Sequence, residues 1–372
     1  MRSGDPVDGL PNMKSPSTGK PNASPTIFDV AEQAGVSIKT VSRVLNREAG
    51  VHAKTREAVL KVVATLKYRP KLSARSLAGA HSYLIGLLYY DPSAAFVAVV
   101  QRGATLRCRE AGYHLVVESL HNDATDIDQQ VDRVVAALRP DGMILTPPLC
   151  DNPKVLKALH DSNTPYVLMS PGKVIKGRPS VRIDDSHAAE EVTNLLISLG
   201  HESIAFIKGP PDQAASAQRY AGFLRAMQAH GLPVDQALVH QGDFTFQTGV
   251  QAAHALLSRR ALPTAVFASN DDMALGVLAA AQRLGLAVPT DLSITGFDDS
   301  PAASLVWPAL TTVRQPVADM ARVAVDMLIA PHPADIALPA QSMHRVLPYE
   351  LVVRDSTCAP RLKPSAKITR AA

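Results

Sequence analysis

The spacing of apolar residues divides the chain into two regions with different patterns. From Tyr83 onward, short apolar runs alternate with longer segments whose apolar residues recur every three or four positions. The runs predict strands at 84–88, 115–117, 142–145, 166–169, 204–207, 265–268 and 292–296. The longer segments predict helices near 97–111, 127–138, 152–161, 187–199, 215–230, 246–259 and 272–285. This alternation is typical of doubly wound parallel sheets with helices on both faces, and its two successive series predict two lobes.

Before Tyr83 the pattern predicts three short helices instead. Thr26 stands three residues before Asp29, which is the arrangement of an N-cap with an acidic partner in the first turn. Gly35 is expected to end this first helix, since glycine adopts the left-handed conformation that closes many helices. Ser37 offers the N-cap of a second helix, and a third is expected from about 54 to 67.

The second of these helices has one apolar and one polar face. Val41, Val44 and Leu45 recur at helical spacing and should face inward. The opposite face carries Ile38, Lys39, Ser42 and Arg43. Three small helices with one polar, basic face form a helix-turn-helix domain, whose second helix enters the major groove of DNA. A helical hairpin with a merely solvated basic face would give the same periodicity, so the pattern alone leaves both interpretations open.

The charge of the chain is concentrated in this helical region. Residues 26–80 hold ten Lys/Arg and four Asp/Glu, a net charge of +6, whereas the whole chain carries only +4. The remaining residues therefore sum to −2. A basic module attached to a nearly neutral body predicts a polyanionic partner for the module, bound with salt-sensitive affinity.

Composition limits the class of protein. A chain of 372 residues with 46% hydrophobic content is long enough for two or three domains with sizeable cores. It holds no run of 18 apolar residues, and residues 1–25, rich in Pro, Ser, Gly and Asn, lack a hydrophobic signal core. We therefore expect a disordered tail at 1–25, a cytoplasmic protein and no membrane partner. Its three cysteines show no metal-ligand spacing, so we expect reduced structural thiols, no metal and no cofactor.

The motif D-V-A-x-x-A-G-V-S-x-x-T-V-S-R-V-L-N, followed by K-T-R and Y-x-P, resembles the DNA-binding headpiece of the LacI/GalR family of bacterial transcription regulators. The resemblance implies a helix-turn-helix DNA-binding domain at 26–71. It also implies DNA contacts at Thr26, Ser37, Ile38, Lys39, Thr40, Ser42, Arg43, Asn46, Thr55, Arg56 and Tyr68. Ile38 and Lys39 fill the two positions that vary among family members and read bases, so we expect an operator different from that of the lactose repressor.

Residues 72–82 correspond to the hinge helix of the resembling family. There a leucine from each subunit enters the minor groove, and the matching residue here is Leu77, with Ala74 beside it. Such a wedge unstacks a base step and bends the duplex, a cost offset by the added contacts. Without the resemblance, a flexible linker would be the preferred interpretation of this segment.

In the second region, polar and aromatic residues suggest a ligand cleft. Ligands of doubly wound sheets bind beyond the carboxyl ends of the strands. The polar residues that follow predicted strands include Asp91, Thr146, Ser170, Asn270 and Asp298. Phe96 and Phe244 could stack on the faces of a polyhydroxylated ring. A strand-end Asp or Asn is equally suited to cap the next helix, and that alternative stays open.

The same core, 83–357, resembles the family's effector domain, which is itself similar to periplasmic sugar-binding proteins. The resemblance implies an N-lobe at 83–183 plus 315–343, a C-lobe at 184–314 plus 344–357, and a tail at 358–372. Family effector contacts carry over to Arg219 in SAQRYAGF, Asn270 in SNDDMALG and Asp298 in GFDDS. Ser170 stands where Asp is common, which argues against a pocket for one particular simple hexose or pentose.

Together these features predict a ligand-responsive transcription regulator that binds operator DNA as a homodimer, and the resemblance implies that it is a repressor. A sugar is the expected effector and a purine the alternative. A periplasmic-type sugar-binding protein would need a signal peptide and no headpiece. An enzyme would need a phosphate loop, a nucleophile elbow or a metal cluster, and no G-x-x-x-x-G-K-[ST] or G-x-S-x-G occurs. No leucine heptads follow Cys358, so we expect a dimer without a tetramerising coiled coil.

Overall fold

The computed structural model describes residues 25–45, 50–68, 81–90, 94–121, 125–330 and 343–361. The chain divides into two compact units, Met1–His81 and Ser82–Ala372. Four residues predicted to contact DNA or effector lie outside the described ranges: Asn46, Ala74, Leu77 and Asp91.

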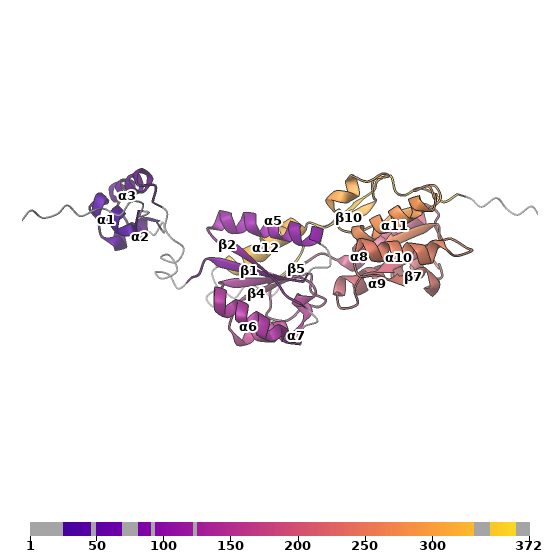
Figure 1. Ribbon diagram of the computed structural model, residues 1–372, viewed down its shortest axis with the longest axis horizontal. Helices are drawn as coiled ribbons and strands as arrows, with labels where there is room; N and C mark the ends of the chain where they lie inside the picture. The colour runs from indigo at the N-terminus through magenta and orange to yellow at the C-terminus, as the bar shows by residue number, and fades with distance from the viewer. Residues whose placement is uncertain are drawn as a thin grey trace, which may run out of the picture. The chain divides into compact units, whose positions relative to one another are not determined.

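The first unit contains the three predicted helices, α1 (Ile27–Ala34), α2 (Ile38–Leu45) and α3 (Ala53–Thr65) (Figure 1). Thr26 begins α1 with a capping box, because its hydroxyl accepts from the Asp29 backbone N–H while its own N–H donates to the Asp29 carboxylate at 2.6 Å. Gly35 ends α1 with a φ of 65°. Both helix-end signals in the sequence therefore act as predicted.

A small apolar core holds these three helices together. Val30, Val41, Val44 and Val59 are buried in it, one or two from each helix. The start of α3 is weaker, because His52 precedes it and makes no side-chain hydrogen bond to the first turn. Burial of the apolar faces leaves the polar face of α2 outside.

The N-lobe of the second unit is built on a six-stranded parallel sheet with strand order β11-β5-β4-β3-β1-β2. Its strands are β1 (Leu84–Tyr89), β2 (His114–Ser119), β3 (Gly142–Leu145), β4 (Tyr166–Met169), β5 (Ser180–Arg182) and β11 (His344–Val346). One face is covered by α5 (Ala94–Ala111) and α12 (Val317–Ile329), and the other by α6 (Ile127–Leu138) and α7 (Pro153–Asp161) (Figure 1). A short 3-10 helix, η1 (Leu149–Asp151), precedes α7.

The C-lobe has a four-stranded parallel sheet with strand order β7-β6-β8-β9. Its strands are β6 (Ile204–Lys208), β7 (Val239–Gln241), β8 (Ala265–Ala268) and β9 (Ser293–Thr295). The pair α8 (Asp185–Ser198) and α9 (Ala214–Ala229) packs on one face, and the pair α10 (Phe246–Leu257) and α11 (Asp271–Arg283) on the other. Two 3-10 helices, η2 (Gln236–Leu238) and η3 (Pro301–Ser304), lie in its loops. The predicted class, a helix-turn-helix unit plus an α/β core of parallel sheets, is confirmed.

The chain passes between the lobes three times: between β5 and α8, between β10 (Thr312–Arg314) and α12, and between β11 and β12 (Glu350–Val352). Strands β10 and β12 pair antiparallel in a small sheet of their own. One boundary differs from the sequence-based one, because β11 pairs with β5 and so places 344–346 in the N-lobe. This three-residue strand is only half-buried or exposed, and therefore carries no apolar run by which to recognise it.

Three helix pairs pack through glycines that no larger residue could replace without movement. A Cβ atom on Gly103 of α5 would lie 2.3 Å from the Ala318 carbonyl oxygen of α12. On Gly222 of α9 it would lie 2.1 Å from the Ser186 carbonyl oxygen of α8, and on Gly249 of α10 it would lie 2.2 Å from a backbone oxygen of α11. The backbones of each pair are thus in direct contact, which fixes the helices that carry the site residues.

The C-terminal segment is attached to the C-lobe beyond the end of the predicted core. His201 is 1% exposed, and its ring nitrogens hydrogen-bond the Thr264 hydroxyl at 2.9 Å and the Cys358 carbonyl at 2.9 Å. The described residues up to 361 are therefore part of the folded lobe.

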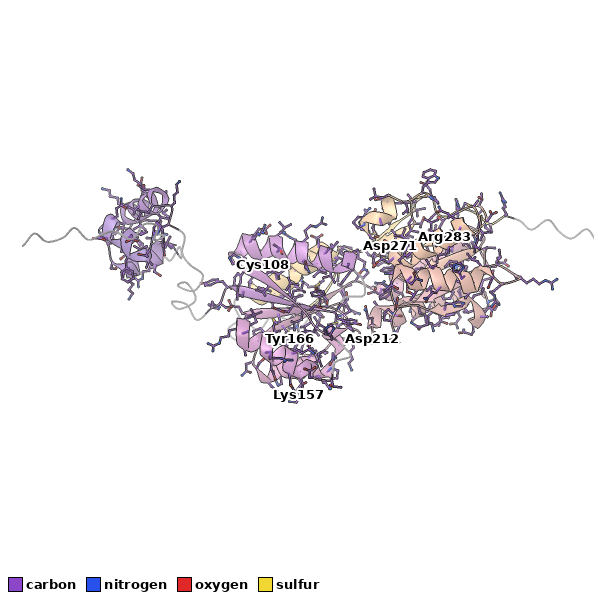
Figure 2. All side chains as sticks on the ribbon, in the orientation of Figure 1. Cys108, Lys157, Tyr166, Asp212, Asp271 and Arg283 are labelled. Atoms are coloured by element: carbon purple, nitrogen blue, oxygen red, sulfur yellow. The ribbon has the colours of Figure 1, made fainter. Side chains whose placement is uncertain are left out.

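On α5 of the N-lobe, burial raises the pKa of the Cys108 thiol to about 11, so the thiol stays protonated and unreactive (Figure 2).

Candidate DNA-binding and effector sites

Helix α2 presents the side chains that the sequence predicts for DNA contact. Ser37 caps the helix, because its hydroxyl oxygen accepts from the Thr40 backbone N–H at 3.2 Å. Ile38, Lys39 and Arg43 are exposed. Val41 and Val44, on the opposite side, are buried against α1 and α3. The helix therefore offers one continuous polar and basic face.

Other predicted DNA contacts have structural roles in the first unit. The Thr26 hydroxyl is used in the capping box, where it also donates to the Asp29 carboxylate at 2.8 Å. Tyr68 is 7% exposed and packs in the three-helix core, and this burial raises its pKa. Thr55 and Arg56 are half-buried near the start of α3. Their contacts with DNA stay predictions.

In the second unit, one cavity collects most of the predicted effector residues. Residues of both lobes line it: Tyr90, Phe96, Val97, Pro147, Ser170, Gln213, Ala215, Arg219, Phe244, Asn270, Asp298 and Gln315. Six of the eight predicted contacts are among them, and Asp91 is outside the described residues. Thr146 is different: it is 1% exposed, its hydroxyl donates to the Leu88 carbonyl at 3.4 Å, and it does not line the cavity.

Arg219 is held in place by a buried ion pair. Its Nε and Nη2 atoms lie 2.9 and 2.8 Å from Oδ1 of Asp185, the first residue of α8, and Nη1 donates to the Ser269 carbonyl at 2.6 Å. The guanidinium carbon also lies 3.7 Å from the ring centroid of Phe297. Arg219 and Asp185 are only 5% and 3% exposed. Burial raises the pKa of Asp185, and the charge of Arg219 opposes this shift.

Asp298 provides a hydrogen-bond acceptor at the cavity. Its Oδ1 accepts from Gln315 Nε2 at 2.6 Å and lies 3.7 Å from Arg219 Nη1. Burial raises the pKa of Asp298 to about 7, although Arg219 and Gln315 act in the opposite direction. Neighbouring Asp271 is also buried, and burial together with the Asp298 charge raises its pKa (Figure 2). The cavity therefore adjoins more carboxyl groups than cations.

The Asn270 side-chain amide makes two hydrogen bonds within the protein. Its Oδ1 caps α11 by accepting from the Met273 N–H at 3.0 Å, and its Nδ2 donates to the Phe244 carbonyl at 2.9 Å. One amide N–H and one lone pair remain for a ligand. Phe244 has a φ of 68°, and its ring occupies the space that a Cβ atom on Gly209 would fill. Asn270 thus orients the stacking residue as well as lining the cavity.

Two residues of the site, Asp185 and Gln315, come from the crossings between the lobes and were missed by sequence reasoning. Asp185 lies three residues after the end of the short strand β5, close to the strand-end position from which other site residues are predicted. The absence of an apolar run at β5 hid this signal. Gln315 follows β10, another three-residue strand, and no sequence signal distinguishes it.

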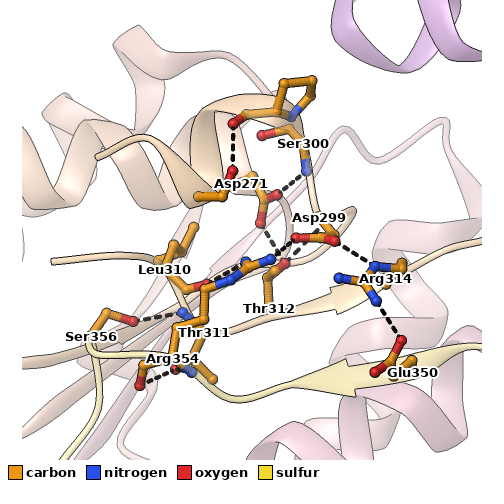
Figure 3. A network of polar contacts seen from close by, with 12 residues as sticks. Asp271, Asp299, Ser300, Leu310, Thr311, Thr312, Arg314, Glu350, Arg354 and Ser356 are labelled. Carbon is orange, nitrogen blue, oxygen red and sulfur yellow. Dashed lines mark hydrogen bonds and ion pairs between the residues drawn. The ribbon is translucent and has the colours of Figure 1, made fainter. Parts of the chain in front are cut away.

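A polar network connects this site to the paired strands β10 and β12 (Figure 3). Asp299, next to Asp298, accepts from Arg314 at 2.6 Å and from Arg354 at 2.5 Å, and Arg314 also reaches Glu350 at 2.5 Å. Asp271 accepts from the Thr312 hydroxyl at 2.6 Å. The carboxylates of Asp299 and Asp271, next in the chain to the lining residues Asp298 and Asn270, are therefore hydrogen-bonded to residues on or beside the strands β10 and β12.

The free energy of unfolding is expected to fall as pH rises from about 4 to 7, because the raised pKa of Asp298 favours its protonated form in the folded state. One carboxyl group of this kind changes the free energy by up to about 1.4 kcal/mol per pH unit. The stabilisation by the Asp298 carboxyl is fully present below its pKa in the unfolded chain, and it is lost as pH rises through its pKa in the folded protein. Urea unfolding of wild type and Asp298→Asn between pH 5 and 8 measures it. His201 acts in the opposite sense, since burial lowers its pKa, but it is present in both proteins and cancels in their difference. A difference that is constant with pH would contradict the assignment.

The part of the chain that the structure describes shows neither a metal site nor a membrane-spanning helix. No cluster of three or more His, Cys, Asp or Glu side chains there has the arrangement of a metal site. Among the same residues, no helix combines the length and apolar character needed to cross a membrane.

Comparison with known families gives two matches. The family model "Bacterial regulatory proteins, lacI family" matches residues 26–71, and the model "Periplasmic binding protein-like domain" matches residues 193–357. Catabolite control protein A of Priestia megaterium is 36% identical over 306 residues, covering 82% of this chain and 91% of that protein. The HTH-type transcriptional repressor PurR of Photorhabdus laumondii is 36% identical over 310 residues, covering 82% of this chain and 89% of the relative.

Solved structures give the same grouping. The lac repressor dimer bound to operator and the anti-inducer ONPF has a TM-score of 0.74 and 29% identity, with 91% of this chain and all of that chain covered. The transcriptional regulator CelR in complex with cellobiose has a TM-score of 0.68 and 31% identity, covering 89% of this chain and 99% of that chain.

Proposed function

This chain belongs to the lacI family of bacterial regulatory proteins, and we propose that it reads its operator through Ile38, Lys39 and Arg43 of α2. It is a DNA-binding transcriptional regulator with an effector-binding core. The observation that carries the assignment of the operator-reading helix is the exposed basic face of α2, whose opposite face, with Val41 and Val44, is buried in the three-helix core. We place its action on chromosomal DNA in the cytoplasm, without a catalytic step.

We further propose that the effector is a sugar bound in the cavity around Asp298. Asp298 accepts hydrogen bonds from hydroxyls, the outer N–H groups of Arg219 donate to them, and the rings of Tyr90, Phe96 and Phe244 offer apolar faces for a sugar ring. The similarity to CelR, which was solved with cellobiose, supports this choice. A purine is the second candidate, since the same rings and the remaining amide groups of Asn270 suit a planar heterocycle.

The effector would change operator affinity through the crossings between the lobes. Asp298 is bonded to Gln315, and Arg219 to Asp185, so two of the three crossings contribute a partner to residues that line the cavity. A ligand that competes for these groups must alter both contacts. Coupling energies of about 1 to 3 kcal/mol are usual for such linked sites. Leu77, in the linker to the DNA-binding unit, would insert into the minor groove as its family counterpart does.

We propose that the regulator acts as a homodimer, as the lac repressor does in its operator complex. After η3, the C-lobe exposes two large apolar residues, Leu305 and Trp307, which are 83% and 80% exposed. Neighbouring apolar residues exposed to this degree often mark an interface.

Substitution of Leu305 and Trp307 by Lys is therefore expected to produce monomers and to weaken operator binding. Sedimentation equilibrium measures the first effect, and fluorescence anisotropy with labelled operator measures the second. Val174→Lys, which replaces an exposed apolar residue of the other lobe, the N-lobe, is the matched control. A double variant that remains a dimer would exclude this surface from the interface.

Selection of bound sequences from a random DNA pool, followed by affinity measurements on the selected site, tests the function. We expect a near-palindromic site whose affinity falls with salt, with a slope of about −0.9 per neutralised phosphate. A thermal-shift screen with sugars and purines on the same protein identifies the effector, because a ligand that binds the native state raises the Tm. Failure to enrich any sequence would refute operator binding, whereas an enriched site combined with no active sugar would refute only the effector class.

A further inference from the structure

A second cavity, separate from the effector cleft, lies in the N-lobe and has a volume of about 710 Å³. It is formed where β4, β5 and β11 begin, together with the ends of α7 and α12. Its apolar lining includes Leu159, Val323, Met327 and Leu328. The volume falls within the range of about 300 to 1,000 Å³ that is common for small-molecule sites.

This cavity is at the opposite edge of the sheet from the effector cleft. All strands of the N-lobe sheet are parallel, so the starts of β4, β5 and β11 lie at one edge and the strand ends near Tyr90 and Ser170 at the other. The backbone N–H groups of Ser82 and Tyr83 donate to the Asp141 carboxylate at 2.7 and 3.1 Å, at the same edge as the cavity. A ligand here would thus be bound next to the point where the chain leaves for the DNA-binding unit.

The polar groups of the lining carry net positive charge. Tyr166, labelled in Figure 2, is a buried residue of this lining. The Arg178 guanidinium lies 4.7 Å from the centroid of its ring, and Arg178 Nη2 donates to His160 Nδ1 at 2.9 Å. Arg345 contributes a second, exposed guanidinium. Asp326 is the acidic residue of the lining, and it is already paired with Arg107 at 2.5 Å.

We propose that this cavity is a second ligand site, specific for an organic anion with an apolar body. The anionic group would be bound by Arg178 and Arg345, whose guanidinium groups provide several donors for a carboxylate, sulfonate or phosphate. The apolar body would pack against Met327 and Leu328 of α12. Arg178 is oriented for this task in advance, because Tyr166 and His160 hold its guanidinium in position.

Two dyes of nearly equal shape and different charge test the proposal on the full chain. One is 8-anilinonaphthalene-1-sulfonate, an anion, and the other is N-phenyl-1-naphthylamine, which lacks the sulfonate. We expect fluorescence titrations of the wild type to show one saturable site per chain for the anionic dye. Arg178→Gln combined with Arg345→Gln should weaken the anionic dye by about ten-fold or more, as the loss of hydrogen bonds to a charged group predicts, and leave the neutral dye almost unchanged.

Two further variants test whether the dyes bind in this cavity. Ala330→Trp, at an exposed position of the lining, should abolish binding of both dyes. Arg133→Gln combined with Arg361→Gln removes the same charge from exposed sites elsewhere and should change neither titration. Urea midpoints of all variants check that the fold is kept.

The proposal is overturned if the anionic dye shows no saturable site, if the control weakens it as much as the Arg178/Arg345 variant, or if Ala330→Trp leaves it bound. Equal losses for the two dyes in the Arg178/Arg345 variant would show that charge is not recognised and would also overturn it. None of these measurements involves operator DNA, so their failure would leave the proposed regulator function intact.

Discussion

Replacement of Arg219 by Met is expected to lower the free energy of unfolding by about 3 to 5 kcal/mol. The reason is the buried position of its partner, since Asp185 is 3% exposed and would keep a carboxylate without a counter-charge. The Ser269 carbonyl would lose its donor as well. Urea unfolding at pH 7 measures the change.

Two further variants separate this explanation from a general loss of packing. Arg219→Met combined with Asp185→Leu should recover most of the lost stability, because no charge then remains buried. Arg225→Met, on the same helix, breaks a more exposed pair with Glu190 and should cost about 1 kcal/mol or less. If Arg219→Met and Arg225→Met lower the free energy of unfolding by the same small amount, the buried ion pair does not stabilise the fold as its geometry indicates. All Arg219 variants should also fail to bind effector, whatever their stability.

Operator binding should be most sensitive to Lys39 and Arg43 of α2. Each of them, replaced by Ala, is expected to weaken binding to the selected operator by about 1 to 3 kcal/mol if its side chain contacts a base. These side chains are exposed, while the helix is held by buried Val41 and Val44, so the substitutions should leave the first unit folded. Fluorescence anisotropy at fixed salt measures the affinity.

The character of the loss distinguishes base contacts from phosphate contacts. A base contact that is lost relaxes sequence selectivity at one position, whereas a lost phosphate contact weakens all sequences alike and reduces the salt slope by about one. Lys61→Ala, on the exposed surface of α3, removes one charge from the same unit and is the matched control. If Lys39→Ala and Arg43→Ala behave as this control does, α2 does not read the operator in the proposed way.

The parts of the fold with strong local signals could be predicted from the sequence. The strand Tyr166–Met169 is a continuous apolar run, and the capping box of Thr26 marks a helix start within one residue. The short strands β5, β7, β10, β11 and β12 could not be recognised, because each has three residues and is defined by its neighbours in the sheet. Their pairing is a property of tertiary contact, and local propensity carries little information about it.

The candidate site shows the same division. The sequence predicts Phe96 as an aromatic that stacks on the ligand, and Arg219 and Asp298 from recognisable motifs, and all three line the cavity. Whether a chosen side chain is available to a ligand could not be read from the sequence. Asn270 illustrates this, since its amide both lines the cavity and caps α11. The partners Asp185 and Gln315 depend on how the crossings place distant segments beside each other.

The three crossings have a consequence for the order in which the protein can be made. The N-lobe begins at residue 84, yet its helix α12 and strand β11 are supplied by 317–346, after nearly the whole C-lobe. Gly103 and Gly142 on the earlier segments pack closely against Ala318 and Leu328 of α12. A nascent chain that has just emerged to residue 314 would therefore expose an unfinished apolar face of its first lobe. On the ribosome, neither lobe can be completed at that point, because the C-lobe also needs the later segment that holds Ser356 and Cys358. A pause in translation before α12 should therefore be the interval at which the chain is most prone to aggregate.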